Sequence, residues 1–211
     1  MKKNKIFCIG LHKTGTSSLH EFSLKCGYKS THSANWAFNN QALEKFDFFS
    51  DGGSHFDNII EFDYESLLHK YPDALFILNV RDARSWIVSK LKHAGWKYDT
   101  LIEHDDPGTL YHDWKKKTFL HIRSFIEHKY SYEAKVKKYF RNNCPEKLLV
   151  IDVTDNKKKE YNIRSLLDFM GLPNDTVVEF PHSNKARQKK RLSDEVMEYI
   201  DNVILAIESK K

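Results

Sequence analysis

The sequence has few cysteines and lacks long apolar runs, internal repeats and low-complexity linkers. Its three cysteines, Cys8, Cys26 and Cys144, are widely spaced and form no CxxC pair. This argues against a disulfide framework and a zinc site, and it favours a reducing compartment. No stretch reaches the about 18 apolar residues of a membrane-spanning helix, which excludes a transmembrane protein. The apolar run at residues 6–11 is too short for a signal peptide, so we interpret it as a β-strand and expect a cytoplasmic protein.

The composition is that of one globular domain with a mild positive charge. The chain has 211 residues, of which 40% are hydrophobic and 13% aromatic, enough to bury a core. Lysine and arginine number 34 against 29 aspartate and glutamate residues, a net charge of +5. This excess fits a polyanionic small ligand or a neutral housekeeping domain, and it is too weak to indicate nucleic acid.

Short apolar runs alternate with helical patterns along the chain, which is typical of βαβ units on a parallel sheet. We therefore predict a single α/β domain over residues 1–211, with a central parallel sheet flanked by helices. The predicted strands are residues 5–10, 28–32, 47–51, 75–80 and 148–153. The predicted helices are residues 16–27, 36–45, 59–70, 83–93 and 163–170. We also expect a helical insertion at about residues 95–145, with two helices between 111 and 142, and an amphipathic C-terminal helix at about 193–209.

The first strand leads into a glycine-containing loop, Gly10-Leu11-His12-Lys13-Thr14-Gly15-Thr16-Ser17-Ser18. A loop of this kind directs backbone N–H groups and the positive end of the next helix at one point, where an anion such as phosphate binds. Gly10 and Gly15 have the spacing of the Walker A pattern, but Thr16 stands where a nucleoside triphosphatase needs lysine. The only lysine of the loop, Lys13, comes three residues earlier. The loop therefore suits a phosphate donor that needs no magnesium, and we expect no metal site.

The same loop resembles the 5′-phosphosulfate loop of sulfotransferases that use 3′-phosphoadenosine-5′-phosphosulfate (PAPS). A second block, the strand at residues 75–80 followed by Arg81 and by Ser89 eight residues later, is similar to the 3′-phosphate-binding segment of that family. Two later stretches, residues 148–153 and 169–184, are similar to a branch with compact, single-domain members. The resemblance runs from about residue 5 to 185, and it implies a P-loop-like sulfotransferase fold.

The resemblance also implies a role for each matched residue. Lys13 would neutralise charge on the leaving phosphate–sulfate bridge, and Arg81 and Ser89 would bind the 3′-phosphate. The 5′-phosphate would be held by the backbone N–H groups of Thr14, Gly15, Thr16 and Ser17, together with the hydroxyls of Thr16, Ser17 and Ser18. His12 lies in the loop and could touch the donor, the acceptor or only solvent. Lys185 and Arg187, in a late basic run, are further candidates for the 3′-phosphate.

An attacking hydroxyl needs a general base, and the sequence leaves three candidates. Asp51, at the end of a predicted strand, is the first choice, His32 is the second and His55 the third. Asp51 is equally well explained as a turn former in Asp51-Gly52-Gly53.

The leading functional hypothesis is sulfuryl transfer from PAPS to a hydroxyl or amine of a small-molecule or glycan acceptor, with adenosine 3′,5′-bisphosphate as product. One alternative is a P-loop nucleotide kinase or nucleoside triphosphatase with an atypical Walker loop. Another is a non-catalytic nucleotide-binding member of the same fold. The sequence identifies neither the acceptor nor the oligomeric state.

Overall fold

A computed structural model describes residues 4–33, 36, 39–51, 63–93, 109–173, 175–176 and 192–210. The chain divides into two compact units. The first contains residues 1–81 and 133–185, and the second contains residues 82–132 and 186–211. No helix among the described residues is long and apolar enough to cross a membrane. The predicted boundaries of one domain over residues 1–211 stay a prediction.

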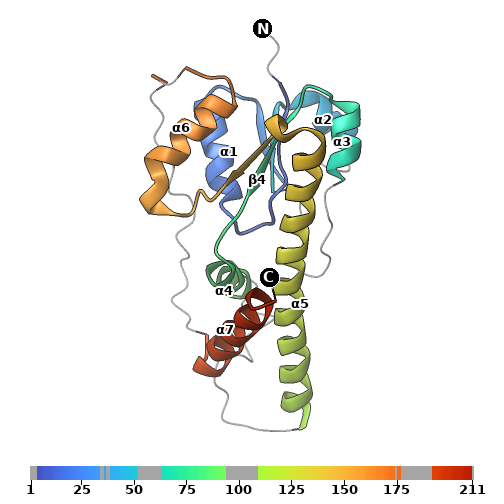
Figure 1. Ribbon diagram of the computed structural model, residues 1–211, viewed down its shortest axis with the longest axis vertical. Coiled ribbons are helices and arrows are strands. Elements are labelled where there is room, and N and C mark those ends of the chain that lie inside the picture. The colour runs from blue at the N-terminus through green and yellow to red at the C-terminus, as the bar shows by residue number, and fades with distance from the viewer. Residues whose placement is uncertain are drawn as a thin grey trace. The chain divides into compact units, whose positions relative to one another are not determined.

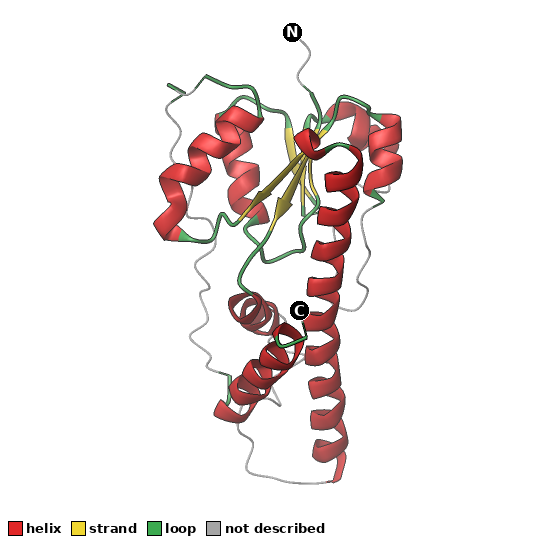
Figure 2. Cartoon of the chain, viewed as in Figure 1, coloured by secondary structure: helices red, strands yellow, loops and turns green. Residues whose placement is uncertain are grey.

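The first unit is built on a five-stranded parallel sheet, drawn as yellow arrows in Figure 2. Its strands are β1 (Ile6–Cys8), β2 (Ser30–His32), β3 (Phe48–Ser50), β4 (Leu75–Asn79) and β5 (Leu148–Ile151). They are hydrogen-bonded in the order β2-β3-β1-β4-β5, and all pairs are parallel. The five strands fall inside the five predicted ranges, so the predicted α/β class with a central parallel sheet is confirmed.

Helices cover both faces of this sheet (Figure 1). Helices α1 (Thr16–Lys25) and α6 (Lys159–Phe169) pack on one face through a largely aliphatic core that includes Ile77, Leu19 and Leu166. The opposite face carries α2 (Asn40–Lys45) and α3 (Tyr64–Lys70). Burying both faces explains why β1, β3 and β4 consist mostly of apolar residues, whereas the edge strand β2 is polar and half-buried.

The face of α2 and α3 is aromatic. Phe7 of β1 stacks on Phe49 at 4.8 Å between ring centroids and on Trp36 at 5.6 Å. Phe76 of β4 meets Phe140 at 5.0 Å, near the end of helix α5 (Thr109–Asn143). Each of these five side chains is at most 1% exposed, so the interlocked rings fix β1, β3 and β4 from this side.

Helix α5 corrects the sequence analysis. Two helices were predicted between residues 111 and 142, but one helix runs from Thr109 to Asn143. The sequence of α5 contains neither proline nor glycine, so nothing in the backbone interrupts its hydrogen bonds.

The second unit is α-helical in its described part. It contains α4 (Ala83–His93), residues 109–132 of α5, and α7 (Asp194–Glu208). Arg84 of α4 donates from Nε to Asp201 of α7 at 2.6 Å, and Phe119 of α5 stacks on Tyr199 of α7 at 4.4 Å. Helix α7 begins at Ser193, whose hydroxyl accepts from the N–H of Val196.

Candidate functional site

Polar residues follow the carboxyl ends of neighbouring strands in the first unit. The glycine-containing loop follows β1, His32 ends β2, Asp51 follows β3 and Arg81 follows β4 shortly after its last residue. Parallel strands bring these ends to one edge of the sheet, and β1 lies between β3 and β4, where the strand order reverses. Ligands of open α/β sheets bind at this edge, beside such a switch point.

The loop after β1 has a backbone that tolerates few side chains. Gly15 has a φ of 95°, and a Cβ atom placed on it would lie 2.4 Å from Cγ2 of Val153. A Cβ atom on Gly10 would lie 2.1 Å from the carbonyl oxygen of Asn79. Lys13, between these glycines, also has a positive φ of 66°. The two glycines are therefore required by close packing against β4 and the β5 turn, and at Gly15 also by the backbone angle.

The loop delivers the N-terminus of α1 without a side-chain cap. Gly15 is the N-cap residue, its carbonyl accepts from the N–H of Leu19, and the first turn contains no acidic residue. The first N–H groups of an α-helix have no carbonyl partner within the helix, and the helix dipole adds partial positive charge there. Two left-handed residues, Lys13 and Gly15, separated by Thr14, also turn N–H groups of the loop out of the regular helical direction. This arrangement is suited to an anion.

Thr14 faces the protein interior, because its side chain is fully buried. Its hydroxyl donates to the carbonyl of Leu11 and accepts a hydrogen bond from Nδ2 of Asn79. Oδ1 of Asn79 accepts from the N–H of Gly10 at 3.1 Å. The predicted role of Thr14 in anion binding is thus left to its backbone.

Asn79 is a site residue that the sequence analysis missed. It is the last residue of β4 and is 0% exposed, whereas the three residues before it, Phe76–Leu78, are apolar and buried. A single amide in an otherwise apolar buried strand was the available signal, because buried polar groups are nearly always hydrogen-bonded.

Two cations lie close together beside the loop. Nη1 of Arg81 donates to the carbonyl oxygen of Lys13 at 3.0 Å. Burial lowers the pKa of Lys13 below its ordinary value, the charge of Arg81 lowers it further, and the charge of Asp51 opposes both effects. The ammonium and the guanidinium thus influence each other electrostatically, as expected of two groups that serve one polyanionic ligand.

The two leading candidates for the base also lie together. Nε2 of His32 is 3.7 Å from Oδ2 of Asp51 and 3.1 Å from Oγ of Ser17. The Thr16 hydroxyl donates to Oδ1 of Asp51 at 3.1 Å. Asp51 has a φ of 63°, a conformation that aspartate adopts in turns, so the turn-forming interpretation also fits. The carboxylate, the imidazole and the first turn of α1 form one connected cluster.

The other ring nitrogen of His32, Nδ1, contacts a residue of strand β3. Nδ1 of His32 and Oγ of Ser50 are 3.0 Å apart, and Ser50 donates its own proton to the carbonyl of Thr31. A hydroxyl that donates elsewhere can still accept, so a neutral imidazole with its proton on Nδ1 can donate to Ser50, and this tautomer presents the lone pair of Nε2 to the cluster. His20 of α1 stacks on His32 at 5.6 Å between ring centroids.

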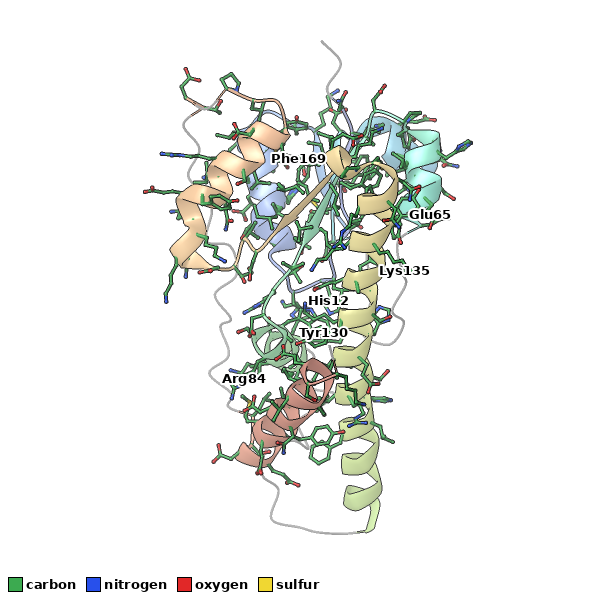
Figure 3. All side chains as sticks on the ribbon, viewed as in Figure 1. His12, Glu65, Arg84, Tyr130, Lys135 and Phe169 are labelled. Atoms are coloured by element: carbon green, nitrogen blue, oxygen red, sulfur yellow. The ribbon has the colours of Figure 1, made fainter. Side chains whose placement is uncertain are left out.

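The remaining predicted residues are placed as follows. His12 lies in the loop after β1 and is buried, with 8% exposed (Figure 3). Ser18 lies in the first turn of α1. Ser89 lies on α4 in the second unit. His55, Lys185 and Arg187 lie outside the described residues. Within the described part of the chain, no group of three or more His, Cys, Asp or Glu side chains could hold a metal ion.

A parallel sheet with an uncapped helix N-terminus and two cations at its carboxyl edge is an α/β arrangement suited to an anion. The family model described as "Sulfotransferase domain" matches residues 5–189. The chain therefore belongs to the sulfotransferase domain family, which confirms the resemblance drawn from the sequence.

The chain is similar in fold to solved structures, among them a sulfotransferase. The crystal structure of a sulfotransferase from Alicyclobacillus acidocaldarius matches with a TM-score of 0.56 and 16% sequence identity, over 99% of this chain and 96% of that chain. At this identity the likeness concerns the fold, and it agrees with the α/β class. A search of curated proteins gives no match.

Proposed function

We propose that the protein transfers a sulfuryl group from PAPS to a hydroxyl or amine of a small-molecule or glycan acceptor, releasing adenosine 3′,5′-bisphosphate. The observation that carries this proposal is the meeting of the uncapped α1 N-terminus with Lys13 and Arg81 at the carboxyl edge of the sheet. Membership of the sulfotransferase domain family supports it.

The donor would be held by charge and backbone rather than by a metal. N–H groups at the start of α1, with the hydroxyls of Ser17 and Ser18, suit the three oxygens of a 5′-phosphate. The ammonium of Lys13 is available for the bridging oxygen on which negative charge grows as the phosphate–sulfate bond breaks. Sulfuryl transfer resembles phosphoryl transfer in depending on alignment and charge stabilisation, so these donors meet its main requirements.

Arg81 would bind a second phosphate of the donor. A guanidinium offers paired N–H donors to phosphate oxygens, and the contact of Nη1 with the Lys13 carbonyl holds this guanidinium beside the loop. We also propose that Arg81 is joined on the 3′-phosphate by Ser89, Lys185 and Arg187.

His32 is the general base in this proposal, ahead of Asp51. An imidazole is the side chain whose ordinary pKa is nearest neutral pH, which makes it the better base for a hydroxyl. In the tautomer whose Nδ1 proton is donated to Ser50, Nε2 is the accepting atom. The Asp51 carboxylate, 3.7 Å from Nε2, would then stabilise the imidazolium formed when the proton is taken.

Calorimetry with adenosine 3′,5′-bisphosphate in the presence of EDTA tests donor binding. We expect binding without magnesium, weakened by Lys13→Ala and by Arg81→Ala about 10- to 100-fold each, because a hydrogen bond to a charged group is worth about 1.5–3 kcal/mol. Lys25→Ala is the matched control, since Lys25 is exposed at the far end of α1. The proposal fails if the wild-type protein does not bind this nucleotide. It also fails if the protein instead binds ATP in a magnesium-dependent way, as a P-loop kinase would.

Transfer of radiolabelled sulfate from PAPS to a panel of acceptors tests catalysis. We expect His32→Ala to remove the acid limb of the pH–rate profile while nucleotide binding persists, and Asp51→Asn to lower the rate. Donor binding without transfer to any acceptor would favour a non-catalytic member of the fold. An unchanged pH profile in His32→Ala would exclude His32 as the base.

A further inference from the structure

We propose that Asn79 is a positioning residue for sulfuryl transfer: its amide clamps both ends of the loop after β1 and so presents Lys13 to the donor. This inference rests on the proposed function. It starts from the placement of Asn79, which is fully buried at the end of a strand whose preceding residues are apolar. An amide in such surroundings is stable only when its donor and its acceptor are both bonded.

The two ends of the amide bind two ends of the loop. Oδ1 accepts from the N–H of Gly10, where the loop leaves β1, and Nδ2 donates to the hydroxyl of Thr14, just before the N-cap of α1. That hydroxyl has one proton, which it donates back to the carbonyl of Leu11. The hydrogen bonds therefore run from the Asn79 amide through the Thr14 hydroxyl to the Leu11 carbonyl. Together they tie the loop to the end of β4.

Lys13 lies between the two clamped positions in a left-handed conformation with a φ of 66°. Such a backbone persists in a residue other than glycine when the neighbouring structure fixes it from both sides. In this conformation the Lys13 carbonyl meets the guanidinium of Arg81, which follows Asn79 by two residues. The end of β4 thus places both cations: Arg81 through the covalent chain, and Lys13 through the Asn79 side chain.

The test separates positioning from stability by comparing single and double variants. Thr14→Val leaves the buried Nδ2 of Asn79 without an acceptor, so we expect it to lower both the unfolding midpoint and the affinity for adenosine 3′,5′-bisphosphate. The double variant Asn79→Leu with Thr14→Val removes the unpaired amide, but it deprives the Gly10 N–H and the Leu11 carbonyl of their side-chain partners, so its midpoint should also lie below that of wild type. Affinity is therefore measured at a temperature where every variant is folded. The affinity of the double variant should stay about 10- to 100-fold below wild type, the range found when residues that orient ligating groups are removed.

Two further variants complete the comparison. Thr14→Ser keeps the hydroxyl and should retain near wild-type affinity. Ser23→Ala is the matched control, because the Ser23 hydroxyl is fully buried in α1 and also donates to a carbonyl three residues earlier, that of His20. We expect Ser23→Ala to lower the midpoint and leave affinity unchanged.

Hydrogen exchange at the Gly10 amide measures how well the hydrogen bond between Gly10 and Asn79 is kept in the absence of a ligand. We expect a protected amide in the wild-type protein and in Ser23→Ala, and a fast-exchanging amide in the double variant. A double variant that binds the nucleotide as tightly as wild type overturns the positioning role while the proposed function stands. A wild-type protein that protects Gly10 but binds no nucleotide overturns the proposed function, and the positioning role for transfer with it.

Discussion

Replacing Gly15 by alanine tests the packing that shapes the loop. With a φ of 95°, an alanine adopts a left-handed conformation that costs about 1–2 kcal/mol. Its Cβ atom would also lie 2.4 Å from Cγ2 of Val153, an overlap of the kind that costs about 1–3 kcal/mol in packed interiors. The free energy of unfolding should therefore fall by about 2–5 kcal/mol in total. That is a large part of the about 5–15 kcal/mol that stabilises a typical protein.

Gly171→Ala is the matched control for this experiment. Gly171 also has a positive φ, of 65°, but a Cβ atom on it meets nothing within 4 Å. It should lose only the backbone contribution, about 1–2 kcal/mol. Urea unfolding followed by circular dichroism measures both variants, and calorimetry with adenosine 3′,5′-bisphosphate shows whether Gly15→Ala also weakens binding.

Adding Val153→Ala to Gly15→Ala isolates the contact itself. The double-mutant cycle should show the Gly15→Ala penalty shrinking towards that of Gly171→Ala once the valine methyl is gone. Two results would refute the reasoning that the β5 turn packs against Gly15. One is an equal loss of unfolding free energy in Gly15→Ala and Gly171→Ala, and the other is a loss in Gly15→Ala that stays the same when Val153→Ala is added.

Two further predictions concern pH. Binding of adenosine 3′,5′-bisphosphate at about pH 9–10 should take up a proton, because phosphate charge raises the pKa of Lys13 that burial and Arg81 lower. Calorimetry in two buffers of different ionisation enthalpy measures this uptake, and identical enthalpies would contradict it. Burial and the nearby His32 lower the pKa of His20, so the unfolded chain binds that proton first and stability falls on acidification through about pH 6.5. The unfolding free energy of His20→Gln should fall less between about pH 8 and pH 5 than that of wild type. Urea midpoints at each pH check this, and parallel curves would count against it.

The centre of the sheet could be predicted from the sequence because β1, β3 and β4 are almost entirely buried. Runs such as Leu75–Val80 have no polar face, and only a parallel sheet covered by helices accounts for them. The single helix α5 could not be recognised in the same way. Its composition changes along its length, and only the absence of proline and glycine argues for continuity.

The loop and the strand-end residues were predictable because their signals are local. Glycine spacing, a lysine within the loop and an arginine directly after a strand can all be read from neighbouring residues. The clamp formed by Asn79 is not local, since it joins residues 79 and 10, 69 positions apart in the chain. The preference between Asp51 and His32 likewise depends on the contacts of each side chain, which no spacing specifies.

A crystal structure with adenosine 3′,5′-bisphosphate tests the central claim most directly. The account predicts the 5′-phosphate within hydrogen-bonding distance of the N–H groups at the start of α1, with Lys13 and Arg81 in contact with the nucleotide. A nucleotide bound away from the loop after β1, touching neither cation, would contradict it.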